Sequence, residues 1–197
     1  MSKISIEDIK KLRTQTGAGM MSAKSALEEA KGNFDQAVEI LRLKGEATAA
    51  KKATRATEHG LVEAYIHNGK IGVLVEVACE TDFVARTDDF KQLAHDLAMH
   101  IAASSPQYLS SDDIPKEIID KENSIYRKEA SIDDKPANVV DKIVEGKFKK
   151  YHSETCLLDQ PFLKDSDKSV AKHLTDVVAK LGENIVINRF VRYELGE

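Results

Sequence analysis

The sequence predicts an α+β protein: an N-terminal three-helix bundle, then a core with a three-stranded antiparallel sheet covered by helices and a protruding helical pair. Three observations favour this class. Apolar residues recur at helical spacing in the first 45 residues, an Asn-Gly dipeptide separates two β-rich runs, and a last β-branched run follows a helix near the C-terminus. The last run completes the sheet, because two strands alone are poorly stable in water.

Composition narrows the classes of function. The 197 residues are 31% charged and 42% hydrophobic, which is ordinary for a folded domain with a real core. A net charge of −4 without a concentrated basic block argues against direct nucleic-acid binding. Because no apolar run approaches the roughly 20 residues that a bilayer requires, and the N-terminus lacks the apolar core of a signal peptide, we expect a cytoplasmic protein without membrane contact.

The first 45 residues predict three short helices. Ser5, with a carboxylate three residues later, is typical of a helix start, and a glycine turn ends that helix. A second helix begins near Ser22 and stops before Gly32, where the left-handed conformation costs glycine nothing. Asn33 can cap a third helix, whose apolar spacing persists until Gly45.

The segment 46–58 differs from both of its neighbours. It is rich in alanine and basic residues and has no apolar stripe, which indicates a helical linker. We therefore predict a helical bundle over 1–45, a linker over 46–58 and a core domain over 59–197 that carries a helical protrusion at about 115–153.

The clearest local signal is a β-hairpin. Asn68-Gly69 best tolerates the positive φ angles of a type I′ turn, and β-rich runs flank it. A two-residue turn sets a register in which the paired residues on one face are all apolar, and we expect this face to be packed: Ile66 with Ile71, Ala64 with Val73, and Val62 with Val75.

The rest of the core alternates helices with irregular chain. Residues 90–101 have the spacing of an amphipathic helix that should cover the hairpin. Two further helices, from 115 to 130 and from 136 to 153, carry narrow apolar stripes that are typical of an antiparallel pair. An anchored loop is expected over 157–165, then a helix over 169–181 and a strand over 184–194.

No constellation of residues predicts an enzyme. Phosphate-binding glycine loops, nucleophile elbows and zinc-protease motifs are absent from the sequence. His95 and His100 are five residues apart, which is wrong for two ligands on one helix face, so we interpret every histidine as structural. Cys79 and Cys156 lack the spacing of a metal site, and we expect both to be reduced and buried. No catalytic residue, metal or cofactor is predicted.

Two sites remain open between a structural and a functional interpretation. In one helix unbroken from Thr81, Phe83 and Phe90 would share a face, and Phe83 would be ordinary core. At a strand-to-helix corner, Phe83 would instead be presented to a partner. Met20 and Met21 likewise either fill the bundle core or offer a soft contact surface.

Four motifs, in order and spanning essentially the whole chain, resemble the bacterial elongation factor Ts family. They are Leu12-Arg13 with Thr16-Gly17-Ala18-Gly19-Met20-Met21 and Lys24, then Cys79-Glu80-Thr81-Asp82-Phe83-Val84-Ala85-Arg86, then Leu157-Leu158-Asp159-Gln160-Pro161-Phe162, and Leu181-Gly182-Glu183-Asn184-Ile185. The resemblance implies a guanine-nucleotide exchange factor that binds the GTPase elongation factor Tu, disturbs its magnesium and phosphate site and expels GDP.

The resemblance also implies which residues contact the partner. A ubiquitin-associated-like bundle would contribute Arg13, Met20, Met21 and Lys24; the corner would contribute Thr81, Asp82, Phe83 and Val84; and the loop before the last strand would contribute Leu181, Gly182 and Glu183.

Two features of this chain qualify the resemblance. The chain has one hairpin and one late strand, as in the short form of the family, so a homodimer is expected. Ser22 stands where many members have an acidic residue, so the resemblance does not extend to a contact from that side chain. The competing classes are an interaction module without exchange activity and an enzyme.

Overall fold

The computed structural model describes residues 4–130 and 136–196, and its contacts gather in two units. The first unit comprises the N-terminal segment up to Val62 together with Glu76–Ala94 and Lys172–Asn188. The second comprises Glu63–Val75, His95–Ala171 and the C-terminal segment from Arg189.

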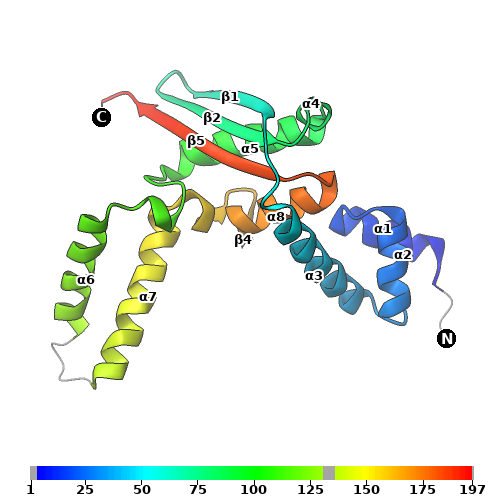
Figure 1. Cartoon of the computed structure of the whole chain (residues 1–197), viewed down its shortest axis with the longest axis horizontal. Coiled ribbons are helices and arrows are strands. Elements are labelled where there is room, and N and C mark those ends of the chain that lie inside the picture. The colour runs from blue at the N-terminus through cyan, green and yellow to red at the C-terminus, as the bar shows by residue number, and fades with distance from the viewer. Residues whose placement is uncertain (1–3, 131–135, 197) are drawn as a thin grey trace. The chain divides into compact units, whose positions relative to one another are not determined.

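The predicted α+β class is confirmed, and Figure 1 shows the elements in chain order. They are α1 Ile6–Thr16, α2 Met20–Glu29, α3 Phe34–Lys52, β1 His59–His67, β2 Ile71–Cys79, α4 Asp82–Ala85, α5 Asp88–Ser104, the 3₁₀ turn η1 Ser111–Asp113, α6 Lys116–Ala130, α7 Ala137–Thr155, the 3₁₀ turn η2 Leu157–Asp159, β3 Pro161–Phe162, β4 Asp165–Ser169, α8 Val170–Leu181 and β5 Ile185–Glu194.

The first three helices form a bundle with its own apolar core. Ser5 caps α1 in a capping box with Asp8, and Asn33 caps α3 by accepting the Gln36 N–H, as the sequence predicts. The core consists of Ile9, Leu12, Ala23, Ala26, Leu27, Ala30 and Ala37. Its small residues allow three short helices to approach closely, although a core of this size is only marginally stable by itself.

Two predicted helix boundaries were wrong. Helix α2 begins at Met20, two residues before the predicted start, and α3 continues through Gly45 to Lys52. A Cβ at Gly45 would lie 3.3 Å from Cβ of Ala179 on α8, so the glycine permits a close approach of two helices and does not end one. Residues 46–52 of the predicted linker, about two helical turns, are therefore the end of α3.

Strand order in the larger sheet is β1-β2-β5, with antiparallel strands. Within the second unit, α5 lies against this sheet at both edge strands. The His95 ring of α5 meets the Tyr65 ring edge to face, with the ring centroids 5.8 Å apart, and Arg192 of β5 donates to the Ala102 carbonyl. The prediction that this helix covers the hairpin is confirmed there.

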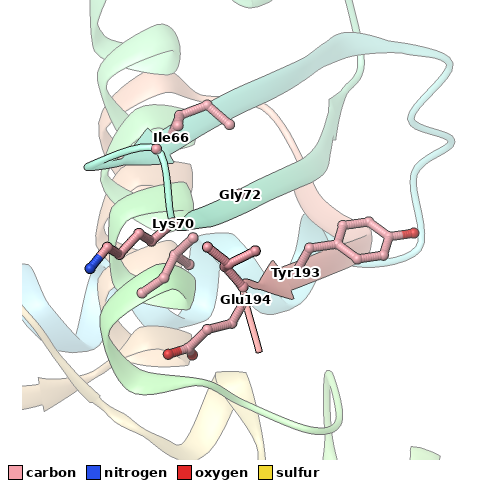
Figure 2. Close-up of a pocket in the computed structure, with 8 residues that line it drawn as sticks. Ile66, Lys70, Gly72, Tyr193 and Glu194 are labelled. Carbon is pink, nitrogen blue, oxygen red and sulfur yellow. The ribbon is translucent and has the colours of Figure 1, made fainter. Parts of the chain in front are cut away.

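The predicted hairpin register was wrong by one residue. Asn68 and Gly69 have φ angles of 50° and 67°, as a type I′ turn requires, but β2 begins only at Ile71. The extra residue places Gly72 on the face of Ile66, whose Cδ1 lies 3.3 Å from a Cβ built at that glycine (Figure 2).

The slip turns the side chains of β1 to the face opposite the expected one, while those of β2 keep theirs. Val73 and Val75 are buried, but Val62, Ala64 and Ile66, which were expected to pack beside them, are exposed. A shift of one residue reverses every side chain of a strand, and a face that also includes Leu74 of β2 is left uncovered.

Helices α6 and α7 pack side by side as the predicted helical pair (Figure 1). The Tyr126 and Phe148 rings meet edge to face, with their centroids 5.2 Å apart, next to buried Val140 and Val144. The part of the predicted protrusion at 131–135 lies outside the described residues.

The segment expected to be an anchored loop contains a small β-hairpin, β3 paired with β4, which the sequence did not predict. Gln160, just before β3, accepts from Nε2 of buried His100 at 2.9 Å and donates to the Ser104 and Glu154 carbonyls. The Leu163 N–H donates to Nδ1 of His100, and burial lowers the pKa of this histidine. His100 is therefore a neutral structural residue, as predicted.

Within residues 4–130 and 136–196, no helix combines the length and the apolar character needed to cross a membrane.

Candidate partner-binding site

The site begins at the corner where β2 meets α4. Helix α4 is a single turn, and α5 starts separately, because Thr87 caps it by accepting the Phe90 N–H at 3.3 Å. The chain changes direction at this break, so Phe83 and Phe90 do not share a helix face. The side chain of Phe83 is 81% exposed, and that of Phe90 is 0% exposed. An unbroken helix with Phe83 in the core is thereby excluded.

Thr81 precedes this turn and is held through each of its polar groups. Its N–H and hydroxyl donate to the two carboxylate oxygens of Glu183, at 3.0 and 2.6 Å. The same hydroxyl accepts from the Val84 N–H, as an N-cap does, and the buried Cys79 thiol donates to the Thr81 carbonyl. Burial, with the nearby charge of Glu183, raises the pKa of Cys79, which keeps this thiol a donor.

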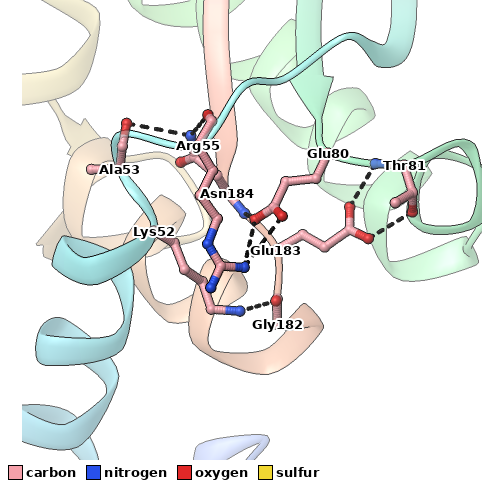
Figure 3. Close-up of polar contacts among 8 residues, drawn as sticks. All are labelled: Lys52, Ala53, Arg55, Glu80, Thr81, Gly182, Glu183 and Asn184. Carbon is pink, nitrogen blue, oxygen red and sulfur yellow. Dashed lines mark hydrogen bonds and ion pairs between the residues drawn. The ribbon is translucent and has the colours of Figure 1, made fainter.

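A second carboxylate joins the same two segments in the opposite direction. The Asn184 N–H donates to Oε1 of Glu80 at 2.6 Å, and Arg55 lies 3.3 Å from Oε2 of Glu80 (Figure 3). The Asn184 hydrogen bond, together with the Arg55 guanidinium, holds the pKa of Glu80 below its ordinary value. Glu80 is therefore ionised at neutral pH and bridges the loop before β5 to the chain after α3.

The chain after α3 is fastened to that loop by further bonds. The side-chain amide of buried Asn184 donates to the Ala53 and Arg55 carbonyls, and Lys52 donates to the Gly182 carbonyl (Figure 3). Gly182 has a φ of 79° and ends α8, as expected of a glycine C-cap.

The structure thus joins two of the three predicted groups of contact residues. Thr81 and Glu183 touch directly, Asp82 pairs with Arg86 at 2.7 Å, and Val84 and Leu181 are half-buried beside them in sequence. Phe83 is the large apolar side chain that this braced corner exposes.

The third group lies on the bundle. Arg13, at the end of α1, and Lys24, which pairs with Glu28 at 3.7 Å, are exposed. Met20 is 42% exposed and Met21 is 75% exposed, so neither methionine fills the bundle core. Ser22 is also exposed, in the first turn of α2.

Sequence reasoning missed the supports of the corner. Cys79 was expected only to be buried, and Glu80, Asn184 and Arg55 were assigned no role. The signal was present in the order of residues, since a glutamate directly follows the buried strand β2 and another precedes β5 by two positions. Which backbone groups these carboxylates reach depends on the pairing of distant strands.

No group of three or more His, Cys, Asp or Glu side chains in the described parts of the chain is placed to hold a metal ion. The corner and the methionine pair instead expose large apolar side chains, those of Phe83, Met20 and Met21.

Comparison with known proteins defines the class. The sequence model of the family described as Elongation factor TS matches residues 5–197. Proteins called Elongation factor Ts are 57% identical in Carboxydothermus hydrogenoformans, over 98% of this chain and 90% of the relative, and 54% identical in Moorella thermoacetica, over 98% and 96%. The one from Thermotoga petrophila is 55% identical over 99% of this chain and 98% of its own.

The chain is therefore an elongation factor of protein biosynthesis. Among such factors, it belongs to the elongation factor Ts family.

Proposed function

We propose that this protein is a guanine-nucleotide exchange factor of the cytoplasm, which binds the GTPase elongation factor Tu and promotes GDP release so that GTP can bind. The observation that carries the proposal is the exposed Phe83 on a corner whose backbone is braced by Cys79 and Glu183. A rigid aromatic anchor loses little conformational entropy on binding, which suits it to enter a partner.

The proposed mechanism needs no covalent chemistry. An exchange factor binds the nucleotide-free GTPase more tightly than the GDP-bound one. The coupling is reciprocal, so the factor by which the exchange factor lowers the affinity for GDP equals the factor by which GDP lowers the affinity for the exchange factor. Mg²⁺ in such GTPases bridges phosphate oxygens and demands near-ideal octahedral geometry. A wedge that displaces the ligands by about an ångström therefore costs the GDP complex much of its stability.

In this proposal the three groups of residues have separate tasks. Phe83, with Asp82 and Val84, enters the partner near its magnesium site, and the neighbouring loop of Leu181 and Gly182 lines the contact. The bundle over residues 1–45, similar to a ubiquitin-associated domain, holds the GTPase domain through Arg13, Met20, Met21 and Lys24. Thr81 and Glu183 belong to the same surface.

Substitution of Met21 by aspartate tests the bundle's task. We expect the variant to need at least tenfold more protein for half-maximal GDP release, because a charge replaces an exposed apolar contact, whereas the maximal rate stays within twofold. The measurement is the release of a fluorescent GDP analogue from elongation factor Tu across a concentration series. The control is Gln36→Asp, at an exposed position of α3 in the same bundle. The exposed Lys31 is not used, because its positive φ would add a backbone effect to the change of charge. An unchanged half-maximal concentration for Met21→Asp would remove the bundle from the interface.

We further propose that two copies associate through the outer face of the larger sheet. Within the second unit this face exposes Ile66, Leu74, Val191 and Tyr193, and Leu195 follows directly. A hollow of about 330 Å³ at the hairpin turn is lined by Ile66, Gly72, Tyr193 and their neighbours (Figure 2). An apolar sheet face of this kind usually requires a cover, and a second copy offers an equally apolar one.

Tyr193→Asp tests the homodimer. Sedimentation equilibrium is expected to give the mass of two chains for the unmodified protein and of one chain for the variant, since a carboxylate in an apolar interface is costly to desolvate. Leu163→Asp, at an exposed apolar position after β3 in the same unit, is the matched control. A monomeric unmodified protein at micromolar concentration would contradict the proposal.

Adding the chain to elongation factor Tu loaded with GDP tests the function itself. Accelerated release at substoichiometric amounts of the chain is expected. Binding without acceleration would favour an interaction module, and the absence of binding would contradict both.

A further inference from the structure

Two glutamates, one on each segment, join the end of β2 to the chain before β5. Glu183 accepts the Thr81 N–H, and Glu80 accepts the Asn184 N–H, so each segment supplies a carboxylate to the other's backbone. We call these four residues the clasp (Figure 3). Carboxylates bind backbone N–H groups about twice as strongly as neutral acceptors do, so the clasp joins the segments more firmly than a single pair of ladder bonds would.

Glu183 reaches the start of the corner turn at two atoms. Its carboxylate holds the N–H of Thr81 at 3.0 Å and the hydroxyl at 2.6 Å, and that hydroxyl is also the N-cap acceptor of Val84. One side chain thus orients both the backbone and the capping group two residues before Phe83. Because the hydroxyl hydrogen points to Glu183, its lone pairs are directed to the Val84 N–H.

Phe83 has little support of its own. The side chain is 81% exposed, and α4 is only four residues long, far below the length at which a helix is stable by itself. The direction of the ring therefore depends on the residues that fix this turn from outside.

We propose that Glu183 is a positioning residue for nucleotide exchange, which acts through Thr81 to hold Phe83 in the direction in which it enters the partner. The inference rests on the proposed function of Phe83 and changes the role of Glu183 from direct contact to support. Both of its carboxylate oxygens already bind Thr81 in the free chain, so binding a partner through them would break bonds that orient the wedge.

The experiment combines three variants in the GDP release assay. Glu183→Ala is expected to lower the maximal rate about tenfold, while the concentration for half-maximal release changes less than threefold, because the affinity contributed by the bundle remains. Glu183→Gln keeps the side-chain length and a carbonyl acceptor, so it should retain at least a third of the rate. Glu58→Ala, at an exposed carboxylate of the same unit, is the control and should match the unmodified protein.

A double-mutant cycle separates positioning from direct contact. In the Phe83→Ala background, Glu183→Ala is expected to have less than a twofold further effect, since it has no ring left to orient. A full tenfold effect there, or a loss of affinity at an unchanged maximal rate, would overturn the proposal in favour of direct contact.

Amide hydrogen exchange of the free chain tests the clasp without any partner. Glu183→Ala should speed exchange at Thr81 and Val84 at least tenfold and leave Phe90 within twofold. Unchanged exchange at Thr81 and Val84 would overturn the clasp. If Glu183→Ala accelerates amide hydrogen exchange but the unmodified chain does not promote GDP release from elongation factor Tu, the proposed function fails while the positioning of the corner stands.

Discussion

Replacement of Phe83 by alanine is expected to slow GDP release from elongation factor Tu by about 30-fold to 1000-fold, the equivalent of about 2–4 kcal/mol for a buried aromatic anchor at an interface. The ring is 81% exposed in the free chain, so its loss removes almost no internal packing. The free energy of unfolding should therefore change by less than about 0.5 kcal/mol. Stopped-flow release of a fluorescent GDP analogue and urea denaturation measure the two quantities.

Leu163→Ala is the matched control for this prediction. Leu163 is also a large, exposed apolar residue, but it follows β3 and belongs to the second unit, whereas the corner belongs to the first. Its truncation should leave the release rate within twofold. If Phe83→Ala releases GDP at the unmodified rate with an intact fold, the wedge is not Phe83.

Replacement of Phe90 by alanine is expected to lower the free energy of unfolding by about 3–5 kcal/mol. Phe90 has no exposed surface, and its removal leaves a cavity in a closely packed core as well as losing apolar burial. Because whole domains are stable by only about 5–15 kcal/mol, a large part of the protein's stability depends on this ring. Equilibrium urea unfolding, followed by circular dichroism, gives the difference.

The conservative variant Phe90→Leu should cost less than about 1.5–2 kcal/mol, since it keeps most of the apolar volume. A loss below about 1 kcal/mol for Phe90→Ala would mean that the ring is not packed as the structure has it. The contrast with Phe83, seven positions earlier, separates a residue that maintains the fold from one proposed to act on a partner.

Local chemistry made much of the fold predictable. Ser5 and Asn33 cap their helices, Asn68-Gly69 adopts the positive φ angles of its turn, and Gly182 ends α8. Each of these signals depends on a few neighbouring atoms, so it can be interpreted from a short stretch of sequence. The helices of the bundle, the hairpin strands and the last strand were predicted from such local patterns, whereas the β3–β4 hairpin was not.

Long-range packing decided what the sequence left open or had wrong. The turn at Asn68-Gly69 was expected to set a register with only apolar pairs on one face, yet β2 begins at Ile71 and Val62, Ala64 and Ile66 are exposed. Gly45 resembled a helix end, but it lies within α3, at a close approach to Ala179, which is distant in the sequence. Local spacing identifies neither the residues that pair with β1 nor the helix that packs against Gly45.

The candidate site divides in the same way. The sequence by itself determined the family, through four ordered motifs, and with it the residues proposed to meet a partner. Only the tertiary structure decided that Phe83 faces outward, because the helix break at Thr87 re-aims it and because Glu183, 102 residues away along the chain, holds Thr81. Periodicity describes the face of a continuous helix, whereas the direction of a side chain at a corner is set by the distant groups that hold its backbone.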